Sequence, residues 1–137
     1  MKRTGIRKTG KSATSKLQKK CDKLLSPIIK DMYPVCLLNG DPDNPNCTYN
    51  TNVAHHHIHK ASSNRLRYDM DNLINLCSHC HFMLHQNESY WASKIVDIKG
   101  VEWFNALEIK KREIIKTNKA YYEGELERLQ DIVDNSS

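Results

Sequence analysis

Four metal-ligating side chains stand within one short stretch of this chain, in the order Cys77, Cys80, His81 and His85. Two residues separate the cysteines, a spacing typical of one half of a tetrahedral zinc site. Side chains four positions apart share one face of a helix, so His81 and His85 can offer two ring nitrogens to one ion. A chain of 137 residues buries a modest core, and a bound structural metal would add to its stability.

Length and cysteine usage restrict the class of protein. At 137 residues the chain is expected to form one domain, with tails at most. No apolar run approaches the roughly 18 residues of a membrane span, and the N-terminus lacks the apolar stretch of a signal peptide. We therefore expect a cytoplasmic protein with no membrane partner. Five cysteines without an export signal are more typical of metal binding than of disulfides.

Positive charge is concentrated at the N-terminus. Residues 1–20 carry eight Lys or Arg and no acid, whereas residues 21–137 carry thirteen basic and sixteen acidic side chains. Residues 1–14 mix Gly, Ser, Thr and Lys without periodicity, so they are expected to be a disordered basic arm. Such an arm, with Arg3, Arg7 and Lys8, suits a nucleic-acid backbone. The alternative is a solvated tail that only aids solubility.

The hydrophobic pattern predicts an α+β fold in which two short strands lie among helices. Apolar residues at helical spacing start after Ser15, and Pro27 is expected to kink or end that helix. Residues 39–50, rich in Asn, Asp, Pro and Gly, are typical of a loop. The other expected elements are strands at 53–58 and 73–76, helices at 78–85, 88–99 and 101–116, and a last helix capped by Thr117 or Asn118.

Further histidines precede the segment from Cys77 to His85. His56 and His57 are adjacent, and neighbouring side chains on a strand point to opposite sides, so one can bind metal while the other faces a water. Asn72 lies where a side-chain amide could pin the loop between the two strands through backbone hydrogen bonds. His55 and His59 are expected to be exposed or to face a phosphate.

The spacing HH-x14-N-x8-H-x3-H, from His56 to His85, resembles the motif of the HNH nucleases, the ββα-metal fold, in the form seen in colicin-type DNases. Residues 72–81 resemble the NLxxLCxxCH core of the cysteine-bearing HNH families. The flanking stretches LQKKCDKL at 17–24, LRYD at 66–69, and YW and VEWF at 90–91 and 101–104 are similar to phage HNH proteins, a group that includes a recombination protein of lambdoid phages.

This resemblance covers residues 15–133 and implies a domain plan and an activity. An HNH nuclease domain would hold a zinc knuckle and ββα-metal core at 34–86, with C-terminal helices at 88–133. The chain would be a phage-encoded, metal-dependent endonuclease in the cytoplasm of a bacterial host. It would hydrolyse phosphodiester bonds of double-stranded or branched DNA in recombination or DNA processing.

The resemblance also implies residue roles. His57 would be the general base, because a neutral imidazole suits that task near pH 7. His56 would be a metal ligand, in place of the Asp common in the family, with His81 and His85 completing the set. Asn72 would orient the loop that carries His57. The ion would be Mg²⁺, Mn²⁺, Ni²⁺ or Zn²⁺, and three imidazoles favour the last three. Some HNH enzymes use the Asn as a ligand, and some do without both helix histidines.

A structural zinc is expected beside this centre. Cys77 and Cys80 would supply one half of its ligands. In related HNH proteins the other half reads CxxCG, but here Cys36 is followed by Leu, Leu, Asn39 and Gly, with Asn39 in place of the second cysteine. Cys47 is the expected fourth ligand, reaching back across the loop. The alternatives are a three-cysteine site completed by another group, or relic cysteines without zinc.

Basic residues between the histidine pair and Asn72 are candidates for phosphate binding. Lys60, Arg65 and Arg67 lie in this segment, and a guanidinium can bind a phosphate through two hydrogen bonds. The competing interpretation is an ion pair between an arginine and Asp69 or Asp71 inside the loop.

Two other functions compete with the nuclease. The first is a non-catalytic, zinc-bearing nucleic-acid-binding accessory protein of recombination, which would keep the cysteines but not need His57. The second is an interaction factor whose C-terminal helices form a homodimer or dock another protein. That function predicts that Leu126, Leu129 and Val133 are exposed in the monomer.

Overall fold

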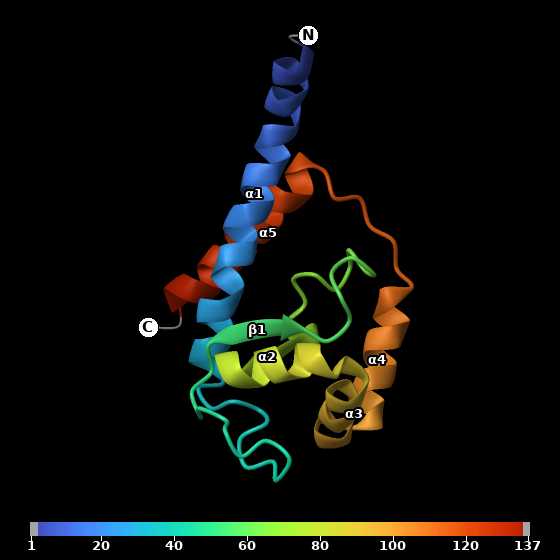
Figure 1. Cartoon of the computed structure of the whole chain (residues 1–137). Helices are drawn as coiled ribbons and strands as arrows, with labels where there is room; N and C mark the ends of the chain where they lie inside the picture. Colours follow the sequence, from blue (N-terminus) through green and yellow to red (C-terminus); the bar gives the residue numbers. More distant parts are fainter. Residues whose placement is uncertain (1–2, 136–137) are drawn as a thin grey trace. The chain divides into compact units, whose positions relative to one another are not determined.

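The computed structural model describes residues 3–135, with side chains from residue 13 onward. It is an α+β structure with five α-helices, one short 3₁₀ helix and a two-stranded sheet among these residues (Figure 1). The elements in chain order are α1 (Arg3–Met32), β1 (Val53–His56), η1 (Met70–Asn72), β2 (Leu73–Leu76), α2 (Ser78–Gln86), α3 (Glu88–Lys99), α4 (Val101–Lys111) and α5 (Lys119–Asn135). None of the described helices combines the length and the apolar character that crossing a bilayer requires.

The chain divides into two compact units, where one domain was expected. One unit consists of helix α1 as far as Leu25 together with the chain from Lys116, which contains α5. The other unit runs from Ser26 to Ile115 and contains the sheet and helices α2 to α4. The metal-ligating residues of the expected motif all belong to this second unit.

Helix α1 corrects two expectations. It begins at Arg3, so residues 3–14 are helical and not the disordered arm that their composition suggested. Once a helix is nucleated, each added residue contributes a hydrogen bond, and no proline interrupts the chain before Pro27. The helix also continues through Pro27 to Met32, so of the two expected outcomes, a kink or an end at this residue, the end is excluded. Ile28 and Ile29, at 3% and 0% exposure, hold this segment by burial worth about 1.5–3 kcal/mol each, comparable to the cost of the proline.

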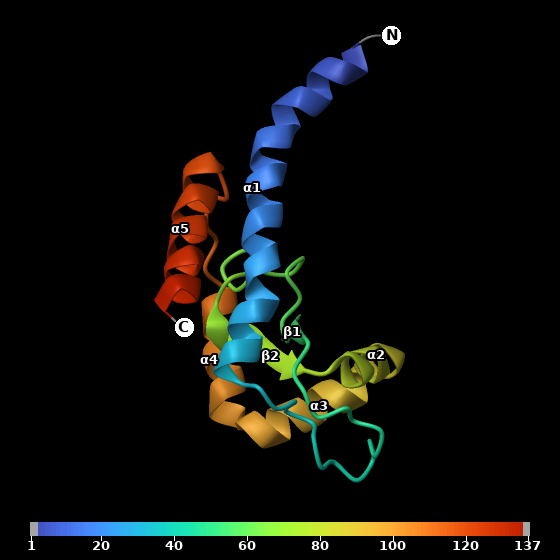
Figure 2. The same cartoon turned by 90° about the vertical axis from the view of Figure 1, so that its left-hand side faces the viewer.

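A β-hairpin-like pair and the helix that follows it form the centre of the second unit. Strands β1 and β2 are antiparallel, with His55 opposite Ile74 and His56 opposite Leu73. All four residues of β2 are buried, and the chain passes from β2 through Cys77 directly into α2 (Figure 2). The core around them consists of Cys36, Leu38, Ile74, Leu76, Cys77, Cys80, Leu84, Trp91 and Ile95. Both strands and helix α2 lie within the ranges expected from the sequence, within one residue at the helix end.

The later helices begin and end largely where the sequence indicates. Helix α3 has the expected bounds, and Gly100, at φ 102°, adopts the left-handed conformation that separates it from α4. Helix α4 ends at Lys111 and not at residue 116, because the chain beyond it has little to pack against: Ile114 is 92% exposed. Asn118 caps α5 by accepting a hydrogen bond from the Tyr121 N–H at 2.9 Å.

Candidate metal centres

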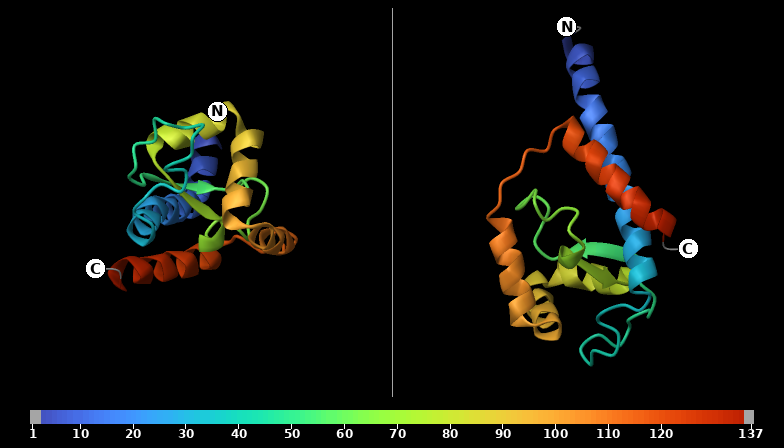
Figure 3. Two further views of the ribbon diagram at one scale, coloured as in Figure 1. Left: turned by 90° about the horizontal axis from the view of Figure 1, so that it is seen from below. Right: turned by 180° about the vertical axis from the view of Figure 1, so that it is seen from behind.

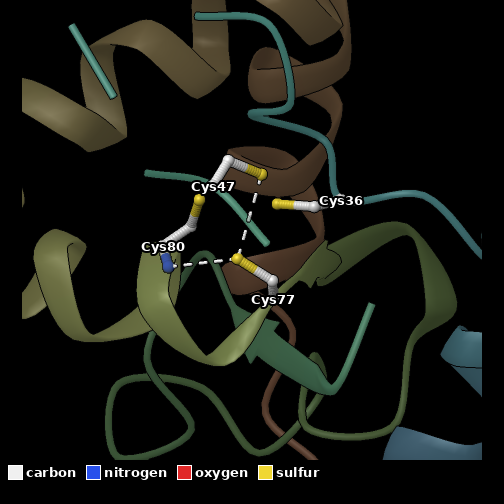
Figure 4. A group of neighbouring side chains, drawn as sticks. All are labelled: Cys36, Cys47, Cys77 and Cys80. Carbon is white, nitrogen blue, oxygen red and sulfur yellow. Dashed lines mark hydrogen bonds between the residues drawn. The ribbon is translucent and has the colours of Figure 1, made fainter. Parts of the chain in front are cut away.

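Four cysteine side chains converge in the second unit. Their sulfurs lie within 4.8 Å of one another, and they come from the segment after α1, the following loop, the end of β2 and the first turn of α2: Cys36, Cys47, Cys77 and Cys80 (Figure 4). The sulfurs of Cys47 and Cys77 are 3.9 Å apart. A tetrahedral zinc with Zn–S bonds near 2.3 Å separates its thiolates by about 3.8 Å, so the cluster fits such an ion. The expected grouping of these four cysteines is therefore confirmed.

Polar N–H groups surround the sulfurs. Four donors point at them: Asn44 Nδ2 to Cys80 at 2.6 Å, Thr48 N to Cys77 at 3.5 Å, Tyr49 N to Cys47 at 3.4 Å, and Cys80 N to Cys77 at 3.3 Å. Donors of this kind offset the negative charge that thiolates bring to a metal site. Asn44, which is only 1% exposed, was not foreseen, because it stands among Asn, Asp and Pro residues that look like turn formers alone.

One cysteine is prepared to ionise. Burial opposes the thiolate of Cys77, but hydrogen bonds from Thr48 and from the Cys80 N–H outweigh it and lower its pKa to about 6. Burial instead raises the pKa of Cys36 to about 11 and also raises that of Cys80. Thiols with a raised pKa would lose their protons to an incoming metal ion, so the affinity for metal should rise with pH.

Ion pairs hold the cysteine-bearing loop against helix α3. Lys94 Nζ donates to Asp41 Oδ1 and to Asp43 Oδ2, each at 2.9 Å. Tyr90 also donates its hydroxyl hydrogen to Asp43. These contacts fasten the residues that directly precede Asn44, so they help to fix the donor that reaches Cys80.

Three histidines form a second cluster. His55 comes from strand β1, and His81 and His85 come from helix α2; one ring nitrogen of each lies within 4.8 Å of the others. The Nε2 atoms of His81 and His85 are 3.1 Å apart. A tetrahedral ion with metal–nitrogen bonds of 2.0–2.1 Å separates its nitrogens by about 3.3 Å. The expectation that His81 and His85 share a helix face is confirmed, and the cluster fits one divalent ion.

Two histidines of this cluster, His55 and His81, are prepared for binding as neutral rings. Burial lowers the pKa of His55 to about 3, and the neighbouring His81 and His85 add to this effect. Burial also lowers the pKa of His81, with a further contribution from His85. A neutral imidazole keeps a lone pair on one nitrogen, as a metal ligand requires. Near pH 7 these two rings can therefore bind a cation without first losing a proton.

The structure places His55, and not His56, beside the helix histidines. Among the described residues His56 belongs to no metal-ligand cluster, and its Nε2 instead contacts the carbonyl oxygen of Arg67 at 2.9 Å. His55 is 7% exposed, so of the two alternatives expected for it, an exposed side chain or one that faces a phosphate, the exposed one is wrong. Alternation explains both corrections, because His55 shares a strand face with Val53, which packs against the core. Val53 was the available signal for choosing among three consecutive histidines.

His57 lies apart from the three-histidine cluster. Its ring packs against two aromatic side chains of helix α4, with centroids 5.0 Å from Trp103 and 5.6 Å from Phe104. Its Nδ1 is buried without a hydrogen-bond partner. Burial lowers the pKa of this ring, so it is neutral near pH 7. These surroundings are those of a packed side chain.

Asn72 fastens the loop that follows strand β1. The residue is fully buried; its Oδ1 accepts from the Ile58 N–H at 2.8 Å, and its Nδ2 donates to the Ile58 oxygen at 2.9 Å and to the Leu66 oxygen at 3.4 Å. The expected pinning of the loop by this amide is confirmed. Both the oxygen and the nitrogen of the Asn72 side chain bond to backbone groups. In this arrangement the side chain supports the loop and is not a metal ligand.

The basic residues of the loop have different environments. Arg65 pairs with Asp69 at 3.1 Å and with Glu113 at 3.0 Å, so the ion-pair interpretation describes it better than phosphate binding. The guanidinium of Arg67 lies 5.8 Å from the centre of the Tyr68 ring, and Lys60 is exposed. The side chains of Arg3, Arg7 and Lys8 lie outside the part of the chain whose side chains are described.

Comparisons with protein-family models, with curated proteins and with solved structures found no match for this chain.

Proposed function

We propose that this chain is a metal-dependent endonuclease that hydrolyses phosphodiester bonds in DNA at an HNH-type ββα-metal centre. One observation carries the proposal: His55 on β1 and His81 and His85 on α2 converge on one point, and burial keeps two of the rings neutral. Two strands followed directly by a helix supply these ligands. This order and this ligand set are what the resemblance to HNH nucleases implies, with the first ligand moved one residue towards the N-terminus.

Three histidines suffice to hold an ion and leave coordination positions for substrate. A divalent ion bound there would stabilise the charge that develops on the scissile phosphate and on the leaving oxygen. All three ligands are uncharged, so the full positive charge of the ion would act on the phosphate. Imidazole ligands favour Zn²⁺, Ni²⁺ or Mn²⁺ over Mg²⁺.

His56 is the best candidate for the general base. It is the neighbour of His55, a proposed ligand. The Nε2 atom of His56 lies 2.9 Å from the Arg67 carbonyl oxygen, which can only accept a hydrogen bond. Donation from Nε2 to this oxygen fixes the tautomer with the lone pair on Nδ1, as a base requires. We therefore assign this role to His56 in place of His57, whose ring is packed against Trp103.

The four cysteines would hold a structural zinc in this proposal. Such an ion would join the segment after α1, the loop, β2 and α2 at one point, close in sequence to His81. It would support the geometry of the histidine cluster without taking part in hydrolysis. The proposed contacts to the DNA backbone are Arg3, Arg7, Lys8, Lys60 and Arg67. The protein would act in phage recombination or DNA processing.

Cleavage assays with histidine variants test the proposal. The parent would be incubated with supercoiled plasmid and a synthetic four-way junction in Mg²⁺, Mn²⁺, Ni²⁺, Zn²⁺ or EDTA. We expect metal-dependent cutting that EDTA abolishes. His55→Ala should lose both cutting and one bound ion, whereas His56→Ala should keep the ion and cut about 10²–10⁴-fold more slowly. His59→Ala is the matched control, because this exposed ring contacts Glu88 and belongs to neither cluster.

The same assay separates the competing assignments. Full cutting by His56→Ala together with loss of cutting by His57→Ala would return the role of base to His57. A folded, zinc-loaded parent that binds both DNAs and cuts neither would favour a non-catalytic nucleic-acid-binding accessory protein. Binding is measured in parallel by electrophoretic mobility shift, at two salt concentrations because phosphate contacts weaken with salt.

A further inference from the structure

Helices α1 and α5 lie side by side within the unit that they form (Figure 3). A groove lies between them. Its volume is about 800 Å³. Its lining consists of Leu17, Lys20, Lys23 and Leu24 from α1 and Glu123, Leu126, Glu127, Gln130 and Asp131 from α5. None of these residues belongs to the metal clusters, so the groove is a feature that the proposed nuclease activity does not use.

The floor of the groove is apolar and incompletely covered. Leu17 and Leu24 are seven residues apart on α1 and so share one face of the helix, and Leu126 faces them from α5. All three are only partly buried. The two helices already pack on their other sides, where the Cys21 thiol donates to the Tyr122 carbonyl at 3.6 Å. Two helices leave such a stripe open to water, whereas four helices can enclose it.

The two rims of the groove carry opposite charge. Lys20 and Lys23 stand on the α1 rim, and Glu123, Glu127 and Asp131 stand on the α5 rim. The three acids are four residues apart, so they form one line along the helix. Within the described part of the chain, none of these five side chains makes an ion pair. The charges of both rims are therefore available to a second molecule.

We propose that this groove docks against the same groove of a second copy of the chain, forming a symmetric dimer. In a two-fold arrangement the same patch meets itself, and when the two-fold axis runs along the groove, the α1 rim of one copy lies along the α5 rim of the other. Positive then meets negative on both sides, and the leucines of both floors are buried together. An acidic or a basic peptide would instead be repelled by one of the two rims, which favours a second copy as the occupant.

Sedimentation velocity with charge-reversed variants tests the dimer. The parent should sediment as a concentration-dependent dimer that 500 mM salt weakens. Lys20→Glu/Lys23→Glu makes both rims acidic, and Glu127→Lys/Asp131→Lys makes the groove largely basic; each alone should dimerise at least about 10-fold more weakly. When the two variants are mixed, the acidic α1 rim of the first variant meets the largely basic α5 rim of the second, and the basic α1 rim of the second meets the acidic α5 rim of the first. The mixture should therefore form a heterodimer.

The mixture distinguishes a second copy from any other occupant. A parent that is monomeric at all concentrations, variants that dimerise like the parent, or a mixture that stays monomeric would each overturn the proposal. Lys30→Glu/Lys116→Glu is the matched control for Lys20→Glu/Lys23→Glu, because it makes the same change in net charge with exposed residues outside the groove. Circular dichroism of every variant establishes that the helices are retained, as expected for exposed substitutions.

Discussion

Asn72 and Ile58 are joined by two reciprocal hydrogen bonds, in which each residue donates to the other, at 2.8 and 2.9 Å. The pair has the geometry of two paired backbone residues, but one partner is a side-chain amide. It closes the loop between β1 and β2 over a separation of 14 residues. His55 and His56 of the proposed centre lie three and two residues before Ile58, so this contact fastens the chain close to the end of β1.

Replacing Asn72 by alanine should destabilise the second unit. The substitution leaves a buried N–H and a buried carbonyl of Ile58 without partners, and each unsatisfied group costs about 1–3 kcal/mol, so the loss should be about 2–6 kcal/mol. Urea denaturation measures it. Asn87→Ala is the control, because the Asn87 side chain makes no capping hydrogen bond to α3. An Asn72→Ala protein as stable as this control would show that the two bonds contribute nothing net.

The ion pairs around Asp69 make stability depend on pH. Burial of Asp69 opposes its charge, but hydrogen bonds from Lys110, the Asp71 N–H and Arg65 outweigh this and lower its pKa. Because the pKa is lower in the folded state, the unfolded state takes up the proton first on acidification. The stabilisation is therefore complete well above pH 4, near the pKa of an unfolded Asp, and is lost as pH falls through the lowered value.

Asp69→Asn isolates this contribution. At pH 7 the variant should be less stable than the parent by about 1–3 kcal/mol, because hydrogen bonds to a charged group are lost. The difference should shrink below about pH 4, where the parent also loses the charge. Asp97→Asn, at an exposed position on α3, should change stability little at any pH. A difference between Asp69→Asn and the parent that stays constant from pH 7 to pH 3 would contradict the assignment.

Removing one cysteine of the cluster should release one zinc ion. Cys47→Ser leaves three thiolates, so metal analysis should give one zinc fewer than in the parent, and thermal unfolding should occur at a lower temperature because metal-binding energy is folding energy. Cys21→Ser is the control: this thiol is fully buried but lies in the other unit, so it should alter stability and keep the zinc content. Equal zinc content in all three proteins would exclude Cys47 as a ligand.

Sequence reasoning succeeded where the signal is local. The spacing of Cys77 and Cys80, the i, i+4 relation of His81 and His85, and the capping of α5 by Asn118 depend on a few neighbouring residues and hold in the structure. The membership of Cys47 also held, because the loop rich in Asn and Pro can turn back over a short distance.

Sequence reasoning failed where a distant residue decides the outcome. Arg65 pairs with Asp69, a partner that the sequence offered, but also with Glu113, 48 residues away, and nothing near Arg65 in the sequence indicates that second contact. The choice of His55 over His56 depends on which face of β1 meets α2, and a shift of one residue exchanges the faces. Leu129 was expected to be exposed if the C-terminal helix docks a partner, but it is fully buried, whereas Leu126 lines the groove.

His57→Phe distinguishes a packed histidine from a catalytic one. The ring contacts Trp103 and Phe104, and its Nδ1 is buried without a partner, so an apolar ring of similar shape removes an unsatisfied polar atom. Such an atom costs about 1–3 kcal/mol, so the variant should be as stable as the parent or more stable by up to about that amount. Cleavage should persist, because the proposal assigns the base to His56. His57→Ala is the companion variant: it opens a cavity beside Trp103 and should lower stability. Loss of cleavage by a stable, metal-loaded His57→Phe protein would show that this imidazole acts in the reaction.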